Sequence, residues 1–256
     1  MRLELGPVES WLREGMGRPR LLVLVDPDRL EPARLEALAR LAPRAGVAAF
    51  LAGTSLLCRA GMGRQLARLK ELSGLKVILF PGDAGQVVPE ADAILFLSLI
   101  SSRNPQYLIG EQVRSAPLLA ASGLECLPTG YLLVESGTHT SAQFMSGSQP
   151  LPRLKADIAV AHALAARALG LRQLYLEAGS GARWPVPEEM IRSVRAAFDG
   201  PLLVGGGLRE AADVACAARA GADLVVVGSR LESCPLEELE TTLGQLTAAL
   251  AGEVAP

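Results

Sequence analysis

Carboxylate residues end two of the short apolar runs in this sequence, and they are the residues best suited to chemistry. Asp26 follows the run Leu21–Val25, and Glu177 lies near the end of the run Gln173–Ala178. A carboxylate at such a position can bind a hard cation, or can take a proton from a reacting hydroxyl. For Glu177, the alternative is a salt-bridged residue that only stabilises the rim of the fold.

A possible cation site extends beyond Asp26. Asp28 lies two residues further on, and Thr54 and Ser55 follow the next apolar run. Mg²⁺ takes one or two carboxylates and fills its other positions with water and substrate phosphate oxygens. Asp26 with a hydroxyl from Ser55 or Thr54 fits that preference. The alternative is that Asp26 merely ends a strand and that Asp28 caps the following helix.

Glycine clusters mark a second possible site, for a phosphate. Gly206 and Gly207 follow one apolar run, and Gly228 and Ser229 follow the next. Glycine lets the backbone approach an anion, the N–H groups at a helix start point towards it, and a serine hydroxyl can donate as well. The alternative is that these glycines only permit tight turns.

Eight apolar runs alternate with helical stretches and must position these residues. Continuous apolar runs suit strands that are covered on both faces, as in a parallel sheet. The predicted strands are Leu21–Val25, Val47–Gly53, Lys76–Phe80, Ala93–Ser98, Tyr131–Glu135, Gln173–Ala178, Pro201–Gly206 and Asp223–Gly228. The predicted helices are Pro32–Leu41, Arg64–Leu72, Asn104–Arg114, Pro152–Leu169, Pro187–Phe198, Arg209–Ala220 and Leu236–Leu250.

This alternation predicts an α/β fold, a (β/α)8 TIM barrel that forms a single domain over residues 1–256. Eight strand–helix repeats in a chain of 256 residues match the usual barrel length of about 250 residues. An open doubly wound sheet is the alternative. In a barrel, active sites lie in the loops after the strands, and phosphate commonly binds after the seventh and eighth strands.

Composition excludes several other classes of protein. The formal net charge is -2, with no basic stripe, so we expect no nucleic-acid partner. The four cysteines lack metal-ligand spacing and are too few for a disulfide framework. The charged N-terminus does not resemble a signal peptide, and no apolar run reaches the roughly 20 residues that span a bilayer. We therefore expect a cytoplasmic protein. Of the two histidines, we expect His139 to lie in an exposed loop and His162 to be a packing residue.

Several segments together resemble the geranylgeranylglyceryl phosphate synthase family, which includes bacterial heptaprenylglyceryl phosphate synthases. The segments are DPDR (26–29), SRNPQYLIGEQVR (102–114), YLEAGSGA (175–182), GGGL (205–208) and VGS (227–229). The resemblance extends from about residue 21 to residue 231. The stretch 136–166 is similar to the group found in some archaea and in bacteria such as Bacteroidetes.

The resemblance implies an enzyme that transfers a polyprenyl group from its diphosphate to the C3 hydroxyl of sn-glycerol 1-phosphate, with Mg²⁺ as cofactor. It implies catalytic roles for Glu177 and Asp26, and metal ligands at Asp26 and Ser55, with Thr54 as a rival. It also implies a homo-oligomer and peripheral membrane contact through the lipid product. The residues implied to bind sn-glycerol 1-phosphate are Tyr175, Leu176, Glu177, Ala178, Gly179, Ser180, Gly181, Gly206, Gly207, Gly228 and Ser229.

Two residues depart from the family pattern. Arg29 stands where the family usually has lysine, and Ser229 stands where it usually has asparagine; both still suit anion binding. A long prenyl tail also needs an apolar wall, and residues at the end of the fourth predicted strand could supply it, unless they are ordinary barrel core. These residues are Leu95, Leu97, Leu99 and Ile100.

Two other functions remain open at this point. Another phosphate-binding barrel enzyme, such as a sugar-phosphate isomerase or aldolase, would explain the glycine clusters equally well. A catalytic lysine at a strand end would favour it, but Lys76 begins a predicted strand and Lys155 begins a helix. A non-catalytic prenyl-lipid binding protein is the other alternative, and the intact carboxylates Asp26 and Glu177 argue against it.

Overall fold

Eight parallel strands close into a barrel in the computed structural model of this chain, which describes residues 5–251. Each strand pairs with the next along the chain, and β8 pairs with β1. The strands are β1 (Arg20–Val25), β2 (Ala49–Ala52), β3 (Lys76–Leu79), β4 (Ala93–Ser98), β5 (Glu125–Leu133), β6 (Gln173–Glu177), β7 (Leu202–Gly205) and β8 (Leu224–Val227). The TIM-barrel prediction is confirmed, and the open doubly wound sheet is excluded.

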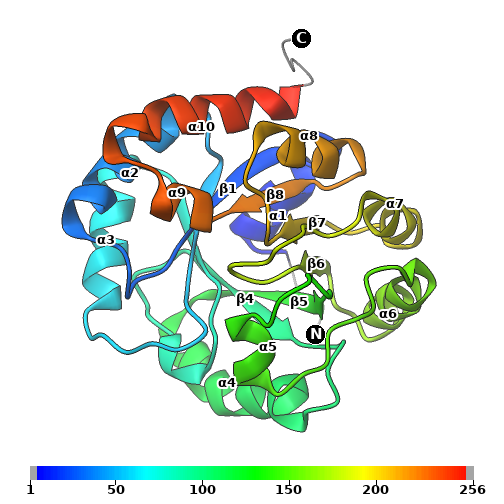
Figure 1. Ribbon diagram of the computed structural model, residues 1–256. Helices are drawn as coiled ribbons and strands as arrows, with labels where there is room; N and C mark the ends of the chain where they lie inside the picture. The colour runs from blue at the N-terminus through cyan, green and yellow to red at the C-terminus, as the bar shows by residue number, and fades with distance from the viewer. Residues whose placement is uncertain (1–4, 252–256) are drawn as a thin grey trace.

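Helices surround this barrel (Figure 1) and bury their apolar faces against it. For example, α2 buries Leu35 and Leu38, and α7 buries Met190 and Val194. The main helices are α1 (Pro7–Glu14), α2 (Pro32–Arg44), α3 (Met62–Ser73), α4 (Glu111–Ser122), α5 (Ser141–Ser146), α6 (Ala156–Ala168), α7 (Glu188–Ala197), α8 (Ala211–Arg219), α9 (Ser229–Ser233) and α10 (Leu239–Ala248). Four short turns complete the set: η1 (Ala84–Gln86), the π-helical η2 (Gln106–Gly110), η3 (Leu236–Glu238) and η4 (Ala249–Ala251). Within residues 5–251, no helix is long and apolar enough to cross a membrane.

The interior of the barrel is a separate apolar core that α1 closes at one end. Leu22, Leu51 and Leu203 point inward from their strands and pack in one cluster with Val8 and Leu12 of α1. In Figure 1, α1 lies behind the strands, opposite the loops that follow them. This helix was not predicted, because the short apolar pattern near the N-terminus lies outside the repeating strand–helix units.

Most predicted elements agree with the structure to within a few residues, and the predicted helix Leu236–Leu250 is divided into η3, α10 and η4; three other elements differ more clearly. Strand β5 begins at Glu125 and not at Tyr131, because Pro128 fits within the strand while its carbonyl accepts the Arg172 N–H. The predicted helix Pro152–Leu169 begins only at residue 156. The predicted helix Asn104–Arg114 is the π-turn η2 followed by α4, which continues to residue 122 with Pro117 inside it.

One side of the barrel lacks a regular repeat. Strands β3 and β4 pair through only two residue pairs, whereas β4 and β5 pair through six. A full helix would ordinarily separate β3 from β4, but here the three-residue turn η1 takes its place. The wall between these strands is therefore thin, and it borders the cavity described next.

Candidate active site

A cavity of about 860 Å³ opens at the carboxyl ends of the strands. Its lining includes residues from the loops after β1, β2, β3, β6, β7 and β8, together with residues of β4, α4 and α5. This is the end of a TIM barrel where active sites are found. Nearly all of the residues predicted for the site therefore come together in one place.

Tightly packed glycines form one side of this cavity. Gly206 and Gly207 have φ of 81° and 71°, a region that favours glycine. A Cβ at Gly206 would collide with Glu177, and a Cβ at Gly207 would lie 2.9 Å from the backbone of Trp184 and Pro185. Both glycines are thus required by close packing between loops, and a tight turn alone does not account for them.

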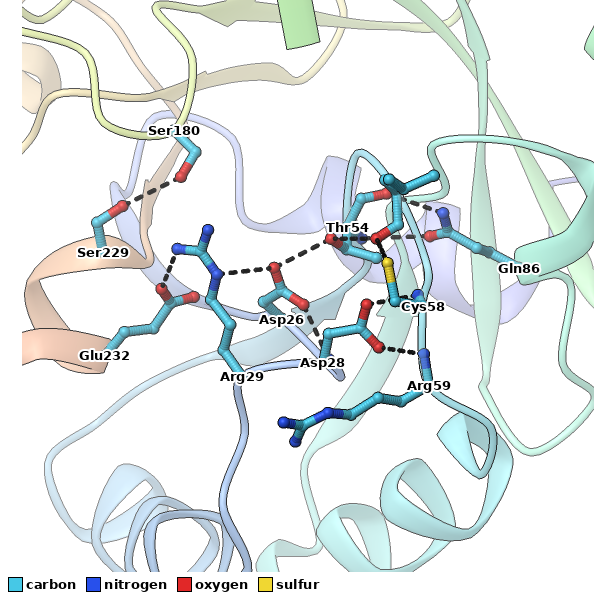
Figure 2. Close-up of polar contacts among 11 residues, drawn as sticks. Asp26, Asp28, Arg29, Thr54, Cys58, Arg59, Gln86, Ser180, Ser229 and Glu232 are labelled. Carbon is cyan, nitrogen blue, oxygen red and sulfur yellow. Dashed lines mark hydrogen bonds and ion pairs between the residues drawn. The ribbon is translucent and has the colours of Figure 1, made fainter. Parts of the chain in front are cut away.

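Two hydroxyl groups face each other on the same side. Ser180 Oγ and Ser229 Oγ lie 3.3 Å apart, and Figure 2 shows the two side chains pointing towards each other. Ser229 begins the short helix α9, and Gly228 lies directly before it. Gly179 and Gly181 have positive φ and also line the cavity. Backbone N–H groups and serine hydroxyls are the donors from which proteins build phosphate sites.

Two predicted substrate contacts lie elsewhere. The side chains of Leu176 and Ala178 pack in the core between the barrel and the helices, and neither residue lines the cavity. The Ala178 N–H also donates to the Gly205 carbonyl, so strand pairing already uses it. The reason is strand alternation: Tyr175 and Glu177 point inward, so the residues between and after them point outward.

Glu177 is a buried carboxylate at the inner edge of the glycine side. Its Oε1 accepts the Gly179 N–H at 2.5 Å, and its carboxylate lies beside Gly205. Burial raises the pKa of Glu177 to about 7, although the Gly179 N–H opposes that shift. Within residues 5–251, no lysine or arginine forms an ion pair with Glu177, so the alternative of a salt-bridged rim residue is wrong.

Three aromatic rings line the cavity together with Glu177. Phe80 and Tyr175 stack with ring centroids 5.1 Å apart, and the Tyr131 ring meets both edge-on. The Glu177 charge adds to burial in raising the pKa of both tyrosines well above the usual value, so both stay protonated at neutral pH. Phe80 and Tyr131 were not singled out from the sequence, because nothing distinguishes an inward-facing aromatic in a strand from ordinary core.

Asp26 lies on the opposite side of the cavity with Thr54. Its Oδ2 accepts a hydrogen bond from Thr54 Oγ1 at 3.0 Å, and its Oδ1 accepts the Asp28 N–H at 2.9 Å. Arg29 Nε lies 3.7 Å from the same Oδ2 (Figure 2). Ser55 lines the cavity, but Thr54 supplies the hydroxyl that contacts Asp26.

Asp28 lines the cavity and braces a loop. Its two oxygens accept the N–H groups of Cys58 at 2.6 Å and Arg59 at 2.8 Å. It therefore does not cap α2, and its carboxylate is already engaged by the loop after β2. Asp26 is the carboxylate that contacts the Thr54 hydroxyl in this part of the site.

Glu232 of α9 is a site residue that the sequence did not reveal. Its carboxylate lines the cavity and lies 3.7 Å from Arg29 Nη1, so Arg29 bridges Asp26 and Glu232. Burial, followed by the charge of Asp26, raises the pKa of Glu232. A glutamate within a short charged helix gives no signal in the sequence that it faces a cavity.

The remaining wall of the cavity is apolar. Leu95, Leu97 and Leu99 line it as predicted, whereas Ile100 packs in the core outside the barrel and does not. The strand end thus supplies a wall and is not core alone. Further apolar lining comes from the thin region between β3 and β4, and from α5: Val87, Ile94, Phe96, Phe144 and Met145.

The two histidines lie as the sequence predicted. His139 is exposed in the loop before α5, at the edge of the cavity. His162 is half-buried on α6, where its Nδ1 lies 2.7 Å from the Ile158 carbonyl. Neither residue contacts Asp26 or Glu177.

A model of the PcrB family matches residues 14–247. The chain belongs to the PcrB family. Among curated members, the chain is 44% identical over 236 residues to the geranylgeranylglyceryl phosphate synthase of Spirosoma linguale, covering 91% of this chain and 95% of that protein. It is 40% identical over 253 residues to the enzyme of that name from Thermococcus kodakarensis, covering 98% and 100%.

Solved structures agree with this PcrB-family assignment. The crystal structure of (S)-3-O-geranylgeranylglyceryl phosphate synthase from Thermoplasma acidophilum, in complex with sn-glycerol-1-phosphate, superposes with a TM-score of 0.86. The two chains are 31% identical, and the match covers 96% of this chain and 99% of that one. In this PcrB-family chain, one cavity combines closely packed glycines and two serine hydroxyls, the buried carboxylate of Glu177, the Asp26–Thr54 pair and an apolar wall.

Proposed function

We propose that this chain is a prenyltransferase that joins a polyprenyl group to the C3 hydroxyl of sn-glycerol 1-phosphate and releases diphosphate. The observation that carries the proposal is the union, in one cavity, of a glycine-lined anion site, the buried Glu177 and an apolar wall. The names of the PcrB-family relatives support it, as does the sn-glycerol-1-phosphate bound by the Thermoplasma acidophilum enzyme.

The acceptor phosphate binds on the glycine side. Gly206, Gly207 and Gly228 bring backbone close to the anion, and Ser180 and Ser229 direct hydroxyls towards it. These donors are fixed before the substrate arrives, so little ordering is lost on binding. With the phosphate held there, the glycerol C3 hydroxyl reaches the carboxylate of Glu177.

Glu177 accepts the proton of that hydroxyl. A buried carboxylate whose pKa is about 7 is partly ionised at neutral pH and is a stronger base than an exposed glutamate. The glycerol oxygen forms a bond to C1 of the prenyl group while the bond from C1 to the diphosphate oxygen breaks. The bonding electrons leave with diphosphate, and the hydroxyl proton passes to Glu177.

Asp26 and Thr54 are the residues that would hold Mg²⁺ together with the donor diphosphate. One carboxylate and one hydroxyl fit this cation, which completes its coordination with water and substrate phosphate oxygens. The described residues contain no cluster of three or more His, Cys, Asp or Glu side chains, so a cage built from protein alone is not part of the proposal. When bound, Mg²⁺ neutralises charge that develops on the departing diphosphate. Ser55, the hydroxyl that the resemblance implies, lines the same cavity, and Thr54, its predicted rival, is the one that contacts Asp26.

The prenyl tail lies along the apolar wall. Leu97, Ile94 and Phe96 extend this wall from the barrel interior to the thin region between β3 and β4. Contact with this surface removes the tail from water, which supplies the main binding energy for a long hydrocarbon. The length of the tail depends on the side chains that end the groove.

The rival functions fit the site less well. A sugar-phosphate aldolase that uses a lysine would need one at the carboxyl end of a strand, but Lys76 begins β3 near Trp11 of α1, at the closed end of the barrel. Lys155 is exposed and does not line the cavity. A protein that only binds prenyl lipids has no need for a buried base beside an anion site.

A donor ladder tests the function directly. The purified chain is incubated with Mg²⁺, sn-glycerol 1-phosphate and prenyl diphosphates of increasing length, and the products are identified by mass. We expect an ether product and free diphosphate. The matched control replaces the acceptor with sn-glycerol 3-phosphate, which should give little product. The absence of ether product with every donor would overturn the proposal.

We also propose that the chain forms a homo-oligomer and makes peripheral contact with membranes as it releases its lipid product. Large apolar side chains are exposed on and near η2, α4 and α6: Ile109, Val113, Leu118, Leu154, Leu164 and Leu169. Light scattering at micromolar concentration should give a mass above 26.9 kDa. A monomer alone would contradict the first part, and failure to sediment with product-containing vesicles would contradict the second.

A further inference from the structure

Gln86 is a fully buried polar residue at the end of η1, in the turn that replaces a helix between β3 and β4. Both ends of its side-chain amide bind the backbone of one residue, Thr54. Gln86 Nε2 donates to the Thr54 carbonyl at 2.8 Å, and Gln86 Oε1 accepts the Thr54 N–H at 3.2 Å (Figure 2). The side-chain amide of Gln86 thus makes hydrogen bonds to the Thr54 N–H and C=O groups that a neighbouring strand would otherwise make.

The position of this contact explains its form. Strands β2 and β3 pair up to Ala52 and Leu79, and the Phe80 N–H then donates to the Ala52 carbonyl. Beyond this point the regular strand pairing ends, and the side-chain amide of Gln86 supplies the hydrogen bonds to the backbone of Thr54. The backbone polar groups of Thr54 therefore stay satisfied although the sheet has ended.

Close packing of glycines confirms that these loops are held at a fixed distance. A Cβ at Gly53 would overlap the Phe80 carbonyl, and a Cβ at Gly82 would overlap the Thr54 carbonyl and lie 3.0 Å from Gln86 Nε2. The loop after β2 and the loop after β3 thus meet backbone to backbone. Thr54 has little freedom to move once Gln86 binds it.

The consequence reaches Asp26 in one step, because Thr54 Oγ1 donates to Asp26 Oδ2 at 3.0 Å. We propose that Gln86 is a positioning residue for the donor end of the site: by clamping the Thr54 backbone, it fixes the Thr54 hydroxyl and the Asp26 carboxylate where Mg²⁺–diphosphate binds. This inference rests on the proposed function, since it takes the prenyl diphosphate as the occupant of that end. Gln86 itself does not line the cavity.

Binding of inorganic diphosphate in the presence of Mg²⁺, measured by calorimetry, tests this role without turnover. Gln86→Met keeps the length and burial of the side chain but removes both hydrogen bonds. We expect its affinity for Mg²⁺–diphosphate to fall about tenfold, the scale of one or two lost hydrogen bonds. Affinity for sn-glycerol 1-phosphate, which binds on the far side of the cavity, should stay within about twofold of the original.

Gln173→Met is the matched control. Gln173 is another fully buried glutamine, on β6 at the barrel interior; it does not line the cavity, and its amide makes no hydrogen bond within residues 5–251. The same substitution there should leave both affinities unchanged. A second variant, Gln86→Glu, keeps the shape of the side chain but turns an oxygen towards the Thr54 carbonyl, so it should also lose affinity for Mg²⁺–diphosphate selectively.

A double-mutant cycle with Thr54→Val shows whether Gln86 acts through Thr54. Coupled residues give non-additive effects, so the double variant should bind Mg²⁺–diphosphate about as weakly as Thr54→Val alone. Additive losses would overturn the proposal, as would unchanged Mg²⁺–diphosphate binding in Gln86→Met and Gln86→Glu. An equal loss of both ligands with a lower melting temperature would also overturn it, because it would reveal a merely structural role.

The two proposals fail in different ways. If the original chain makes the ether product while Gln86→Met binds Mg²⁺–diphosphate normally, only the role of Gln86 is overturned. If the original chain makes no ether product, the proposed function is overturned. A selective loss of Mg²⁺–diphosphate binding in Gln86→Met would support the positioning role even then.

Discussion

The two sides of the cavity are built in different ways. On the side of β6–β8, glycines that pack against neighbouring loops bring backbone to the cavity, beside the side chains of Glu177, Ser180 and Ser229. On the side of β1–β4, the groups are side chains: a carboxylate, a hydroxyl, an arginine and an apolar wall. The glycine side belongs to a complete strand–helix pattern, whereas the other side has a short β3–β4 pairing and a turn in place of a helix.

This difference suits the two substrates of the proposed reaction. A small acceptor with one phosphate needs a fixed set of donors, and backbone supplies them with no loss of side-chain freedom. A donor with a diphosphate and a long tail needs a cation, charge and an extended apolar surface. Substitutions on the two sides should therefore separate the kinetics of the acceptor from those of the donor.

Asp26→Ala should have the largest effect. Without this carboxylate, the diphosphate loses its bound cation, so we expect turnover to fall by roughly a thousandfold or more while the fold stays intact. Asp26→Asn, which keeps the shape but not the charge, should be nearly as slow. Activity within a few-fold of the original at saturating Mg²⁺ would remove Asp26 from the metal site; melting temperatures serve as the control for folding.

Glu177→Gln should lower kcat by about 10²–10⁴-fold, the usual contribution of a general base, with little change in donor binding. In the original chain, kcat should rise with pH through about 7 as Glu177 ionises, and the variant should lack that rise. A variant that kept its rate but melted at a lower temperature would show that Glu177 only stabilises the barrel.

The same variant makes a prediction about stability with a definite sign. The pKa of Glu177 is raised from 4.5 to about 7 on folding, so its contribution to stability is present in acid and is lost as pH rises through about 7. Glu177→Gln avoids burying a charge, and at pH 8 it should be more stable by up to about 3 kcal/mol. Thermal unfolding at pH 5 and pH 8 measures this difference; equal shifts at both pH values would contradict it.

Gly207→Val should act on the acceptor alone. Its φ of 71° and the backbone 2.9 Å from a new Cβ leave no room for the side chain, so the phosphate loop must shift. We expect the KM for sn-glycerol 1-phosphate to rise more than tenfold and the KM for the donor to change little. Gly170→Val is the control: it has a φ of 78° but no atom within 4 Å of the new Cβ, and it lies outside the cavity lining. Equal effects on both KM values would show that the two sides are not independent.

Phe96→Ala should have the smallest effect, confined to the donor. The Phe96 ring lines the apolar wall beside the thin β3–β4 region, and its loss removes contact area without disturbing the charged groups. The KM should rise several-fold for long prenyl diphosphates, less for short ones, and not at all for sn-glycerol 1-phosphate. An equal rise in KM for long and short prenyl diphosphates would mean that the tail takes another path.

The regular part of this molecule could be predicted from the sequence, and the irregular part could not. Continuous apolar runs identified all eight strands, and strand ends correctly located Asp26, Glu177 and Gly207 at one end of the barrel. These sequence patterns failed to identify residues whose role depends on partners that are distant in sequence. Gln86 lies in a polar turn without periodicity, and only the fold brings it to Thr54.

Side-chain direction set a second limit. The segment YLEAGSGA (175–182) resembles the family, which makes each of its residues a candidate for substrate binding. Strand alternation, however, points Leu176 outward while Glu177 faces the cavity. Whether Thr54 or Ser55 is the hydroxyl nearest Asp26 likewise depends on the conformation of the loop after β2. That loop is held in place by the loop after β3, through Gln86. Residue type fixes what a group can do, while its neighbours fix whether it faces the substrate.

Helix α1, which closes the far end of the barrel, has a kinetic consequence. Val8 and Leu12 fill the floor, so the chamber is closed at the α1 end and opens at the carboxyl ends of the strands. The donor and the product both reach solvent at this open end, and the ether lipid carries the same tail as the donor from which it is made. The finished product should therefore act as a competitive inhibitor against the prenyl diphosphate, and the rate of continuous synthesis should depend on an acceptor phase that removes the lipid from the entrance.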